Sequence, residues 1–90
     1  MKESEIENKS CAEAKRHGWW GIKLVPLKCA GLPDRMFIGH GKVVFIEYKR
    51  PGENLRPIQR AIHKKFASHG REVFVAHSVV ETMEILNSSI

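Results

Sequence analysis

Charged side chains follow an apolar strand pattern without a break. The run Val43–Ile46 is apolar at every position, which is typical of a strand buried on both faces. It continues directly into Glu47, Tyr48 and Lys49. Because side chains alternate along a strand, Glu47 and Lys49 share a face with Phe45. Ionised groups that extend a buried row are costly unless they are paired or bound to a metal.

Asp34 is the expected neighbour of Glu47. A two-residue hairpin loop at 40–41 would place Asp34 opposite Glu47, and it would place Met36 opposite Phe45 as an apolar pair. A bulge would shift this register by one residue. Directly opposed carboxylates destabilise a sheet, and a divalent cation between them reverses the sign of that interaction. Oxygen ligands without His or Cys favour Mg²⁺ or Mn²⁺ over zinc.

The elements that must position these residues follow from periodicity and from the residues that begin and end helices. We expect helices over residues 3–17, 57–69 and 78–87, and strands over residues 21–27, 35–38, 42–49 and 72–76. The expected apolar sides of the last two helices are Ile58, Ile62 and Phe66, and Val79, Met83, Leu86 and Ile90. The order αβββαβα predicts an α/β protein whose mixed sheet is flanked by helices on both faces.

Length and composition limit the class of protein. The 90 residues suffice for a single domain, which we expect to span residues 1–90. The formal net charge of +5 and the pI near 9.5 suit a nucleic-acid partner. No apolar run approaches the roughly 20 residues that cross a bilayer, and the acidic N-terminus lacks a signal-peptide core. We therefore expect a cytoplasmic protein without a membrane partner.

Three segments contain the residues singled out above and those around them: Gly31-Leu32-Pro33-Asp34-Arg35, Val44-Phe45-Ile46-Glu47-Tyr48-Lys49 and Arg56-Pro57-Ile58-Gln59. Together they resemble the VRR-NUC family, a branch of the PD-(D/E)XK nuclease superfamily. The resemblance covers nearly the whole chain in the same αβββαβα order. It implies a PD-(D/E)XK core and Mg²⁺- or Mn²⁺-dependent hydrolysis of phosphodiester bonds in DNA. For compact members, which occur alone in phages and bacteria, it implies a homodimer acting on branched DNA such as Holliday junctions.

The resemblance also implies roles for individual residues. Asp34 and Glu47 would bind the metal together with the backbone carbonyl of Tyr48. Lys49 would be the positive group of the active site, and Gln59 would support the site from the following helix.

A glutamate of the first helix completes the family's site. It best matches Glu7, which would join the metal ligands and the catalytic residues. Glu7 shares a narrow helix face with Cys11 and Ala14, whose small side chains permit a close approach to the sheet. The rival glutamates of the same helix are Glu3, Glu5 and Glu13.

Basic residues of the second helix form a stripe. Arg56, Arg60 and Lys64 recur at every fourth position and can follow a phosphate backbone, although such a stripe is also typical of a solvated helix face. Its position next to the acidic residues favours DNA, and Arg35 is a further candidate contact. Trp19-Trp20 is expected to be half in the core and half in a subunit interface.

Two other classes of protein remain open from the sequence. A basic DNA-binding module of the same fold without catalysis explains the charge and the stripe, but not the set of Asp34, Glu47 and Lys49. A purely structural α/β protein explains the fold alone. Metal-dependent cleavage of plasmid or junction DNA distinguishes the three.

Overall fold

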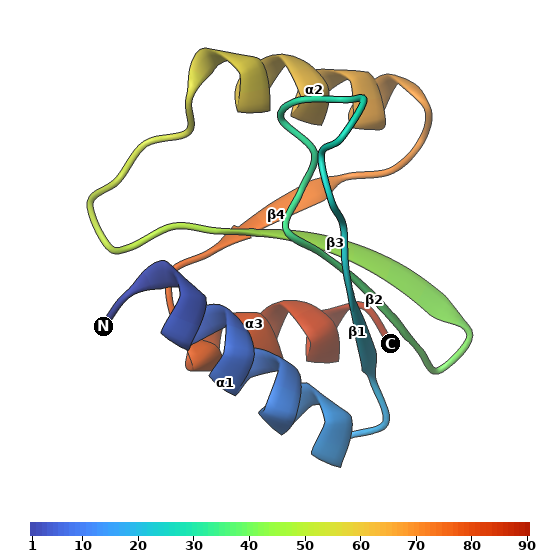
Figure 1. Cartoon of the computed structure of the whole chain (residues 1–90). Coiled ribbons are helices and arrows are strands. Elements are labelled where there is room, and N and C mark those ends of the chain that lie inside the picture. The colour runs from blue at the N-terminus through green and yellow to red at the C-terminus, as the bar shows by residue number, and fades with distance from the viewer.

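A computed structural model describes residues 1–90, with three helices and four strands (Figure 1). In chain order they are α1 (Glu3–Arg16), β1 (Trp20–Lys23), β2 (Arg35–Gly39), β3 (Lys42–Tyr48), α2 (Pro57–Ser68), β4 (Val73–Ala76) and α3 (Val79–Ser88). The expected αβββαβα order is confirmed. None of the three helices is long and apolar enough to cross a membrane.

The four strands form one mixed sheet in the order β1-β2-β3-β4. The first three strands pair antiparallel, and β4 pairs parallel to β3 because α2 provides the crossover between them. His40 and Gly41 both have positive φ, at 51° and 72°, as a two-residue hairpin turn requires. Gly39 therefore pairs with Lys42, and the expected hairpin register is confirmed.

Helices cover both faces of the sheet, as the mixed pattern predicted. Helices α1 and α3 pack against each other on one face, and α2 lies on the other (Figure 1). The core lies on the α1–α3 side and consists of Ile6, Ala14, Trp19, Phe37, Val44, Ile46, Tyr48, Ala76 and Leu86. Of the tryptophan pair, Trp19 is buried and Trp20 is 67% exposed.

The first strand is shorter than its sequence pattern. It was expected over residues 21–27, but it begins at Trp20 and ends at Lys23. Leu24 still donates its N–H to the Asp34 carbonyl at 3.0 Å. Beyond it, Pro26 has no N–H to donate, so the pairing cannot extend along the rest of the apolar run.

The buried sides of α2 and α3 also differ from their apolar stripes. In α2 only Gln59 is buried, whereas Ile58 is 44% exposed. In α3 the buried residues are Thr82 and Leu86, and the expected core residue Ile90 is 64% exposed because the helix ends before it. Gln59 and Thr82 are thus buried in addition to the expected apolar residues, of which Leu86 is buried and Ile62, Phe66, Val79 and Met83 are half-buried.

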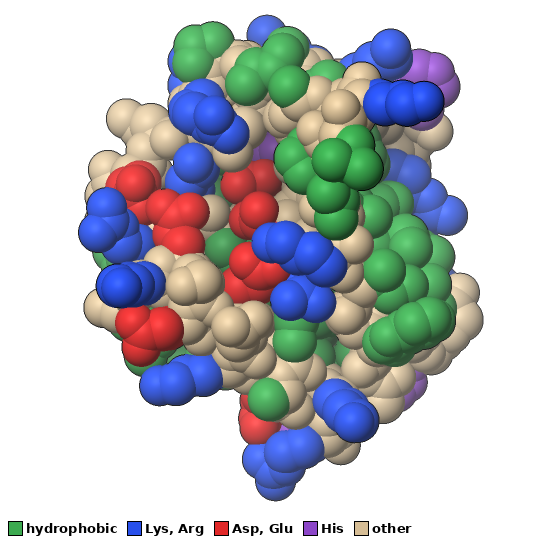
Figure 2. Space-filling model, in the orientation of Figure 1, with side chains coloured by type: hydrophobic (Ala, Val, Ile, Leu, Met, Phe, Trp, Pro, Cys, Tyr) green, Lys and Arg blue, Asp and Glu red, His purple; other side chains and the backbone are tan.

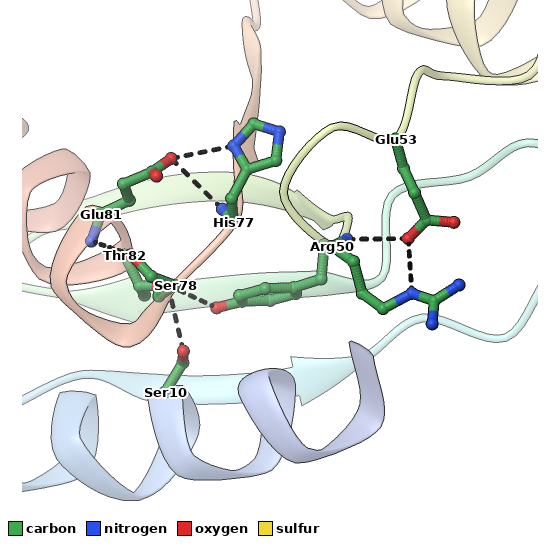
Figure 3. A network of polar contacts seen from close by, with 8 residues as sticks. Ser10, Arg50, Glu53, His77, Ser78, Glu81 and Thr82 are labelled. Atoms are coloured by element: carbon green, nitrogen blue, oxygen red, sulfur yellow. Dashed lines mark hydrogen bonds and ion pairs between the residues drawn. The ribbon is translucent and has the colours of Figure 1, made fainter. Parts of the chain in front are cut away.

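A cluster of buried hydroxyl groups joins α1, α3 and β3 on the face of the sheet that α1 and α3 cover. The Thr82 hydroxyl lies 3.1 Å from the hydroxyls of both Ser10 and Tyr48, and 3.0 Å from the Ser78 carbonyl (Figure 3). Burial raises the pKa of Tyr48 to about 12, so the phenol stays protonated and can donate. These bonds fix the Tyr48 side chain, whose backbone lies between Glu47 and Lys49 on β3.

Candidate active site

Two carboxylates meet near the carboxyl end of β3. Asp34 stands one step beyond the last β2–β3 pair, Arg35 with Ile46, so the register brings it opposite Glu47. Its Oδ2 atom accepts the backbone N–H of Tyr48 at 2.8 Å. Asp34 is therefore held by its side chain to β3 and by its carbonyl to the end of β1.

The loop before Asp34 depends on Gly31 for its position. Gly31 has a φ of +85°, and a Cβ atom there would lie 2.7 Å from the carbonyl oxygen of Ile58. Only glycine combines this backbone conformation with so close an approach to α2. Pro33, directly before Asp34, is fully buried. The segment Gly31–Asp34 is thus packed closely against α2, and this packing fixes the position of the Asp34 backbone.

Glu47 is 2% exposed and has one partnered and one free oxygen. Its Oε2 accepts from Gln59 Nε2 at 3.0 Å, whereas the buried Oε1 has no hydrogen-bond partner. The Gln59 Oε1 atom accepts the backbone N–H of Arg56 at 2.9 Å. Because a backbone N–H can bond only to the amide oxygen, this contact turns the amide nitrogen of Gln59 towards Glu47.

The surroundings of Glu47 favour its neutral form when no cation is present. Burial, followed by the adjacent carboxyl group of Asp34, raises the pKa of Glu47 to about 8, and Lys49 opposes the shift. A buried, unpartnered carboxylate oxygen beside a second carboxylate is a place where a cation removes both repulsion and desolvation cost.

We expect this shift to make the metal-free protein less stable as the pH rises. The folded-state pKa of about 8 lies above the ordinary value of 4.5, so the folded state holds the proton more tightly. The free energy of unfolding should fall by several kcal/mol between these pH values, since one pKa unit corresponds to about 1.4 kcal/mol. Urea unfolding of the wild type and Glu47→Gln in EDTA measures this. The variant should lack most of the decline, and parallel pH profiles would contradict the shift.

Lys49 lies two residues beyond Glu47 and is 8% exposed. Its backbone N–H donates to the carbonyl of Ala76, the last residue of β4, at 3.1 Å, which continues the β3–β4 pairing one residue past the end of β3. The Lys49 ammonium group takes part in none of the ion pairs of the structure. A nearly buried cation without a fixed partner is available to an anionic ligand.

Glu7 and Glu3, one turn apart on α1, have different surroundings. Glu7 is 7% exposed and its Oε1 accepts from Lys23 Nζ at 2.8 Å and from Arg35 Nε at 2.7 Å. Glu3 lies towards the acidic pair instead. Its pKa is raised, first by burial and then by Glu53, with smaller influences from Lys49 and Asp34.

Glu53 is an acidic residue near the site that the sequence did not single out. It lies in the segment between β3 and α2, where the Pro51-Gly52 break indicated only a turn. Its Oε1 accepts from the backbone N–H and the Nε of Arg50, at 2.9 and 3.1 Å (Figure 3). Arg50, together with a contact to Glu3, lowers the pKa of Glu53 to about 2. Figure 2 shows acidic side chains gathered between the start of α1 and α2, with Lys and Arg side chains around them.

The candidate DNA contacts fall into two groups. Arg56, Arg60 and Lys64 are all exposed along α2. Arg60 also donates to the Leu55 carbonyl at 2.8 Å. Arg35 differs, because its side chain is only 17% exposed and is paired with Glu7. The structure therefore leaves the α2 stripe open to solvent and holds Arg35 inside the protein.

The donor set suits a hard divalent cation better than zinc. No group of three or more His, Cys, Asp and Glu side chains converges as a ready-made metal cage. Asp34 and Glu47 supply two carboxylates, and Mg²⁺ commonly uses one or two carboxylates and completes its shell with water and substrate oxygens. The unpartnered Oε1 of Glu47 is the atom that such an ion would satisfy.

The fold and the arrangement of these side chains define the class of protein. A mixed sheet flanked by helices, with Asp34 at a hairpin base, Glu47 on the second strand of the hairpin and Lys49 directly after it, is the PD-(D/E)XK nuclease fold. A solved structure described as a VRR_NUC domain superposes with a TM-score of 0.83 over 94% of both chains, at 24% identity.

A relative in sequence extends this result. The chain is 33% identical to "Putative nuclease p44" of Acyrthosiphon pisum secondary endosymbiont phage 1. The alignment of 79 residues covers 87% of this chain and 85% of the phage protein. No family model matches the chain. Taken with the structural match, this relative shows that the chain belongs to the VRR-NUC family.

Proposed function

We propose that this protein is a divalent-metal-dependent DNA endonuclease that hydrolyses phosphodiester bonds in branched DNA, such as a Holliday junction. The observation that carries the proposal is the buried, unpartnered Oε1 of Glu47 beside Asp34, with the unpaired Lys49 two residues further on. The name of the phage relative, a nuclease, supports the same activity.

Each residue has a distinct task in this proposal. Asp34, Glu47 and the Tyr48 carbonyl hold Mg²⁺ or Mn²⁺, which when bound lowers the pKa of water and polarises the phosphate. Lys49 holds the attacking water or the phosphate charge that grows in the transition state. Gln59 keeps the Glu47 carboxylate in one orientation through the bond at 3.0 Å.

The α1 glutamates divide the remaining roles. Glu7 is the candidate from the family motif, and its bonds to Lys23 and Arg35 tie α1 to the first two strands. Glu3 is the rival that the surroundings favour as a further ligand, because Asp34 and Lys49 influence its pKa. Comparison of the cleavage rates of Glu3→Gln and Glu7→Gln shows which of the two glutamates the reaction needs.

A DNA cleavage assay tests the proposal against its alternative, a non-catalytic DNA-binding module of the same fold. Purified protein is incubated with supercoiled plasmid and with a labelled four-way junction, in Mg²⁺, in Mn²⁺ and in EDTA. We expect cut products only with a metal, and more from the junction than from linear duplex. Tight binding without any product in either metal would refute catalysis and favour the module.

The α2 stripe is expected to bind phosphates without reading sequence. Replacement of Arg56, Arg60 or Lys64 by Ala should weaken binding to all DNA sequences alike, because phosphate contacts carry no sequence information. Each lost contact should reduce the slope of log K against log salt by about 0.9. Fluorescence anisotropy at several salt concentrations measures both. Arg16→Ala, an exposed cation on α1, is the control, and a loss confined to one sequence would contradict the prediction.

We expect a homodimer with two-fold symmetry. A small domain that exposes Trp20, Val25 and Leu27, by 67%, 59% and 86%, leaves apolar surface next to the edge strand β1. Two active sites in a fixed relation would also suit the two strands that must be cut in a junction.

Sedimentation equilibrium at micromolar concentration tests the dimer. Trp20→Ser should shift the mass towards the monomer, whereas Val80→Ser, an equally exposed apolar residue on α3, should not. A wild-type mass near 10.3 kDa with and without junction DNA would contradict the dimer. A flap or single strand would then be the better substrate.

A further inference from the structure

A hollow beside the candidate active site has an apolar, partly aromatic lining. It encloses about 340 Å³ between α2, β3 and the loop that precedes Asp34. Its apolar lining comes from Cys29, Phe45, Ile62 and Phe66. The rings of Phe45 and Phe66 meet edge to face, with centroids 4.9 Å apart. This volume lies at the small end of the range for ligand sites and suits a small, flat group.

The remaining lining residues are all basic. They are Lys65 and His69 at the end of α2 and Arg71 in the turn that follows it, and all three are exposed. No acidic side chain contributes to the hollow. An apolar interior with basic residues around it is complementary to a flat, apolar ligand that carries negative charge beside it.

The hollow lies close to the candidate active site along β3. Phe45 lies two residues before Glu47 on the same face of β3, a separation of about 7 Å along the strand. Lys65 adjoins the hollow and lies about 100° around α2 from Lys64, so the hollow and the α2 stripe occupy different sides of the helix. A nucleotide next to the phosphate at Glu47 is therefore within reach of the hollow, and its own phosphates are within reach of the basic residues.

We propose that the hollow receives an unpaired base of the DNA substrate, with neighbouring phosphates held by Lys65 and Arg71. The proposal rests on the nuclease function above and adds a reason for selecting branched DNA. A base inside a duplex must be unstacked and unpaired before it can enter, whereas a base at a branch point or flap pays less of this cost. Contact with Phe66 tolerates any sequence, because every base has a π-face.

Scanning single abasic sites through the DNA tests this assignment without catalysis. Binding of full-length protein to a labelled four-way junction is measured by anisotropy in Ca²⁺, with one base removed at each position near the branch. Loss of one base–aromatic contact weakens binding about tenfold. We expect such a loss at one or two positions for the wild type. Phe66→Leu should bind intact DNA about tenfold more weakly and show no further loss at those positions. Val80→Leu is the matched control.

Equal abasic penalties in the wild type and Phe66→Leu at every position would overturn the assignment. If Phe66→Leu fails the thermal-unfolding control, Cys29→Asp replaces it, because Cys29 is exposed and an added carboxylate should repel the phosphates. Cys29→Asp should weaken junction binding more than duplex binding, and an equal effect on both would also overturn it. A Phe66→Leu variant that changes only the sedimentation mass would assign the hollow to a second copy of the chain.

The two proposals fail independently. A wild type that shows the position-specific abasic loss but never cleaves DNA in Mg²⁺ or Mn²⁺ refutes the nuclease and leaves the base site standing. A wild type that cleaves junctions and shows no position-specific loss keeps the nuclease and refutes the base site.

Discussion

Glu47→Gln and Asp34→Asn are each expected to lower the cleavage rate by at least about 10³-fold in saturating Mg²⁺, because a bound metal contributes several kcal/mol of transition-state stabilisation. Each substitution removes a charge but keeps the shape of the side chain. The fold should be unaffected, since Glu47 favours its neutral form in the metal-free protein and both amides keep the size and hydrogen-bonding oxygen of the acids that they replace. Single-turnover cleavage of a labelled junction measures the rate.

Glu84→Gln provides the control for these variants. Glu84 is an exposed glutamate on α3, on the opposite side of the sheet, and its replacement should leave the rate unchanged. Far-UV circular dichroism and the unfolding midpoint establish that the inactive variants are folded. Wild-type activity in either site variant would refute the proposed metal ligands.

Lys49→Ala should reduce the rate by about 10²- to 10³-fold and still bind metal, because the expected role of Lys49 is to stabilise developing charge. Lys49 is 8% exposed and its ammonium group forms no ion pair, so the substitution breaks no salt bridge. Lys49→Arg should recover only part of the activity, since the planar guanidinium cannot occupy the same point.

Titration of Lys49→Ala with Mn²⁺ checks the second half of that expectation. Metal affinity should equal or exceed that of the wild type, because a nearby positive charge disfavours a cation. Loss of metal binding together with activity would show that Lys49 supports the metal site, contrary to the role proposed for it.

The hairpin that carries the acidic pair could be predicted from local sequence. A strand that is apolar on both faces, a His40-Gly41 turn and the alternation of side chains between the two faces together predict one hairpin register. The structure has that register. Such features depend on residues close in the chain, so the sequence displays them directly. The order of the elements was predictable for the same reason.

Features that depend on distant contacts could not be predicted in this way. Arg35 has the type and position of a DNA contact, but it pairs with Glu7, which is 28 residues away. Thr82 is buried although it lies outside the expected apolar stripe, and its partner Ser10 is 72 residues away. Glu53 approaches Glu3 only because the segment after β3 folds back towards the start of α1.

Gln59 illustrates a position where function and periodicity disagree. Its burial interrupts the expected apolar side of α2, and no rule of helix periodicity predicts a buried amide there. The interruption has a physical reason, because the amide joins the first turn of the helix to Glu47. The family motif identified the residue, and the structure shows what its side chain contacts.

Anomalous diffraction from crystals soaked in Mn²⁺ locates the cation most directly. We predict a peak between the carboxylates of Asp34 and Glu47, within about 2.5 Å of the Oε1 atom that has no partner in the protein. The same map shows which of Glu3 and Glu7 contributes a ligand. A peak elsewhere on the protein, with none at Glu47 in well-ordered density, would contradict a metal-dependent active site at this position.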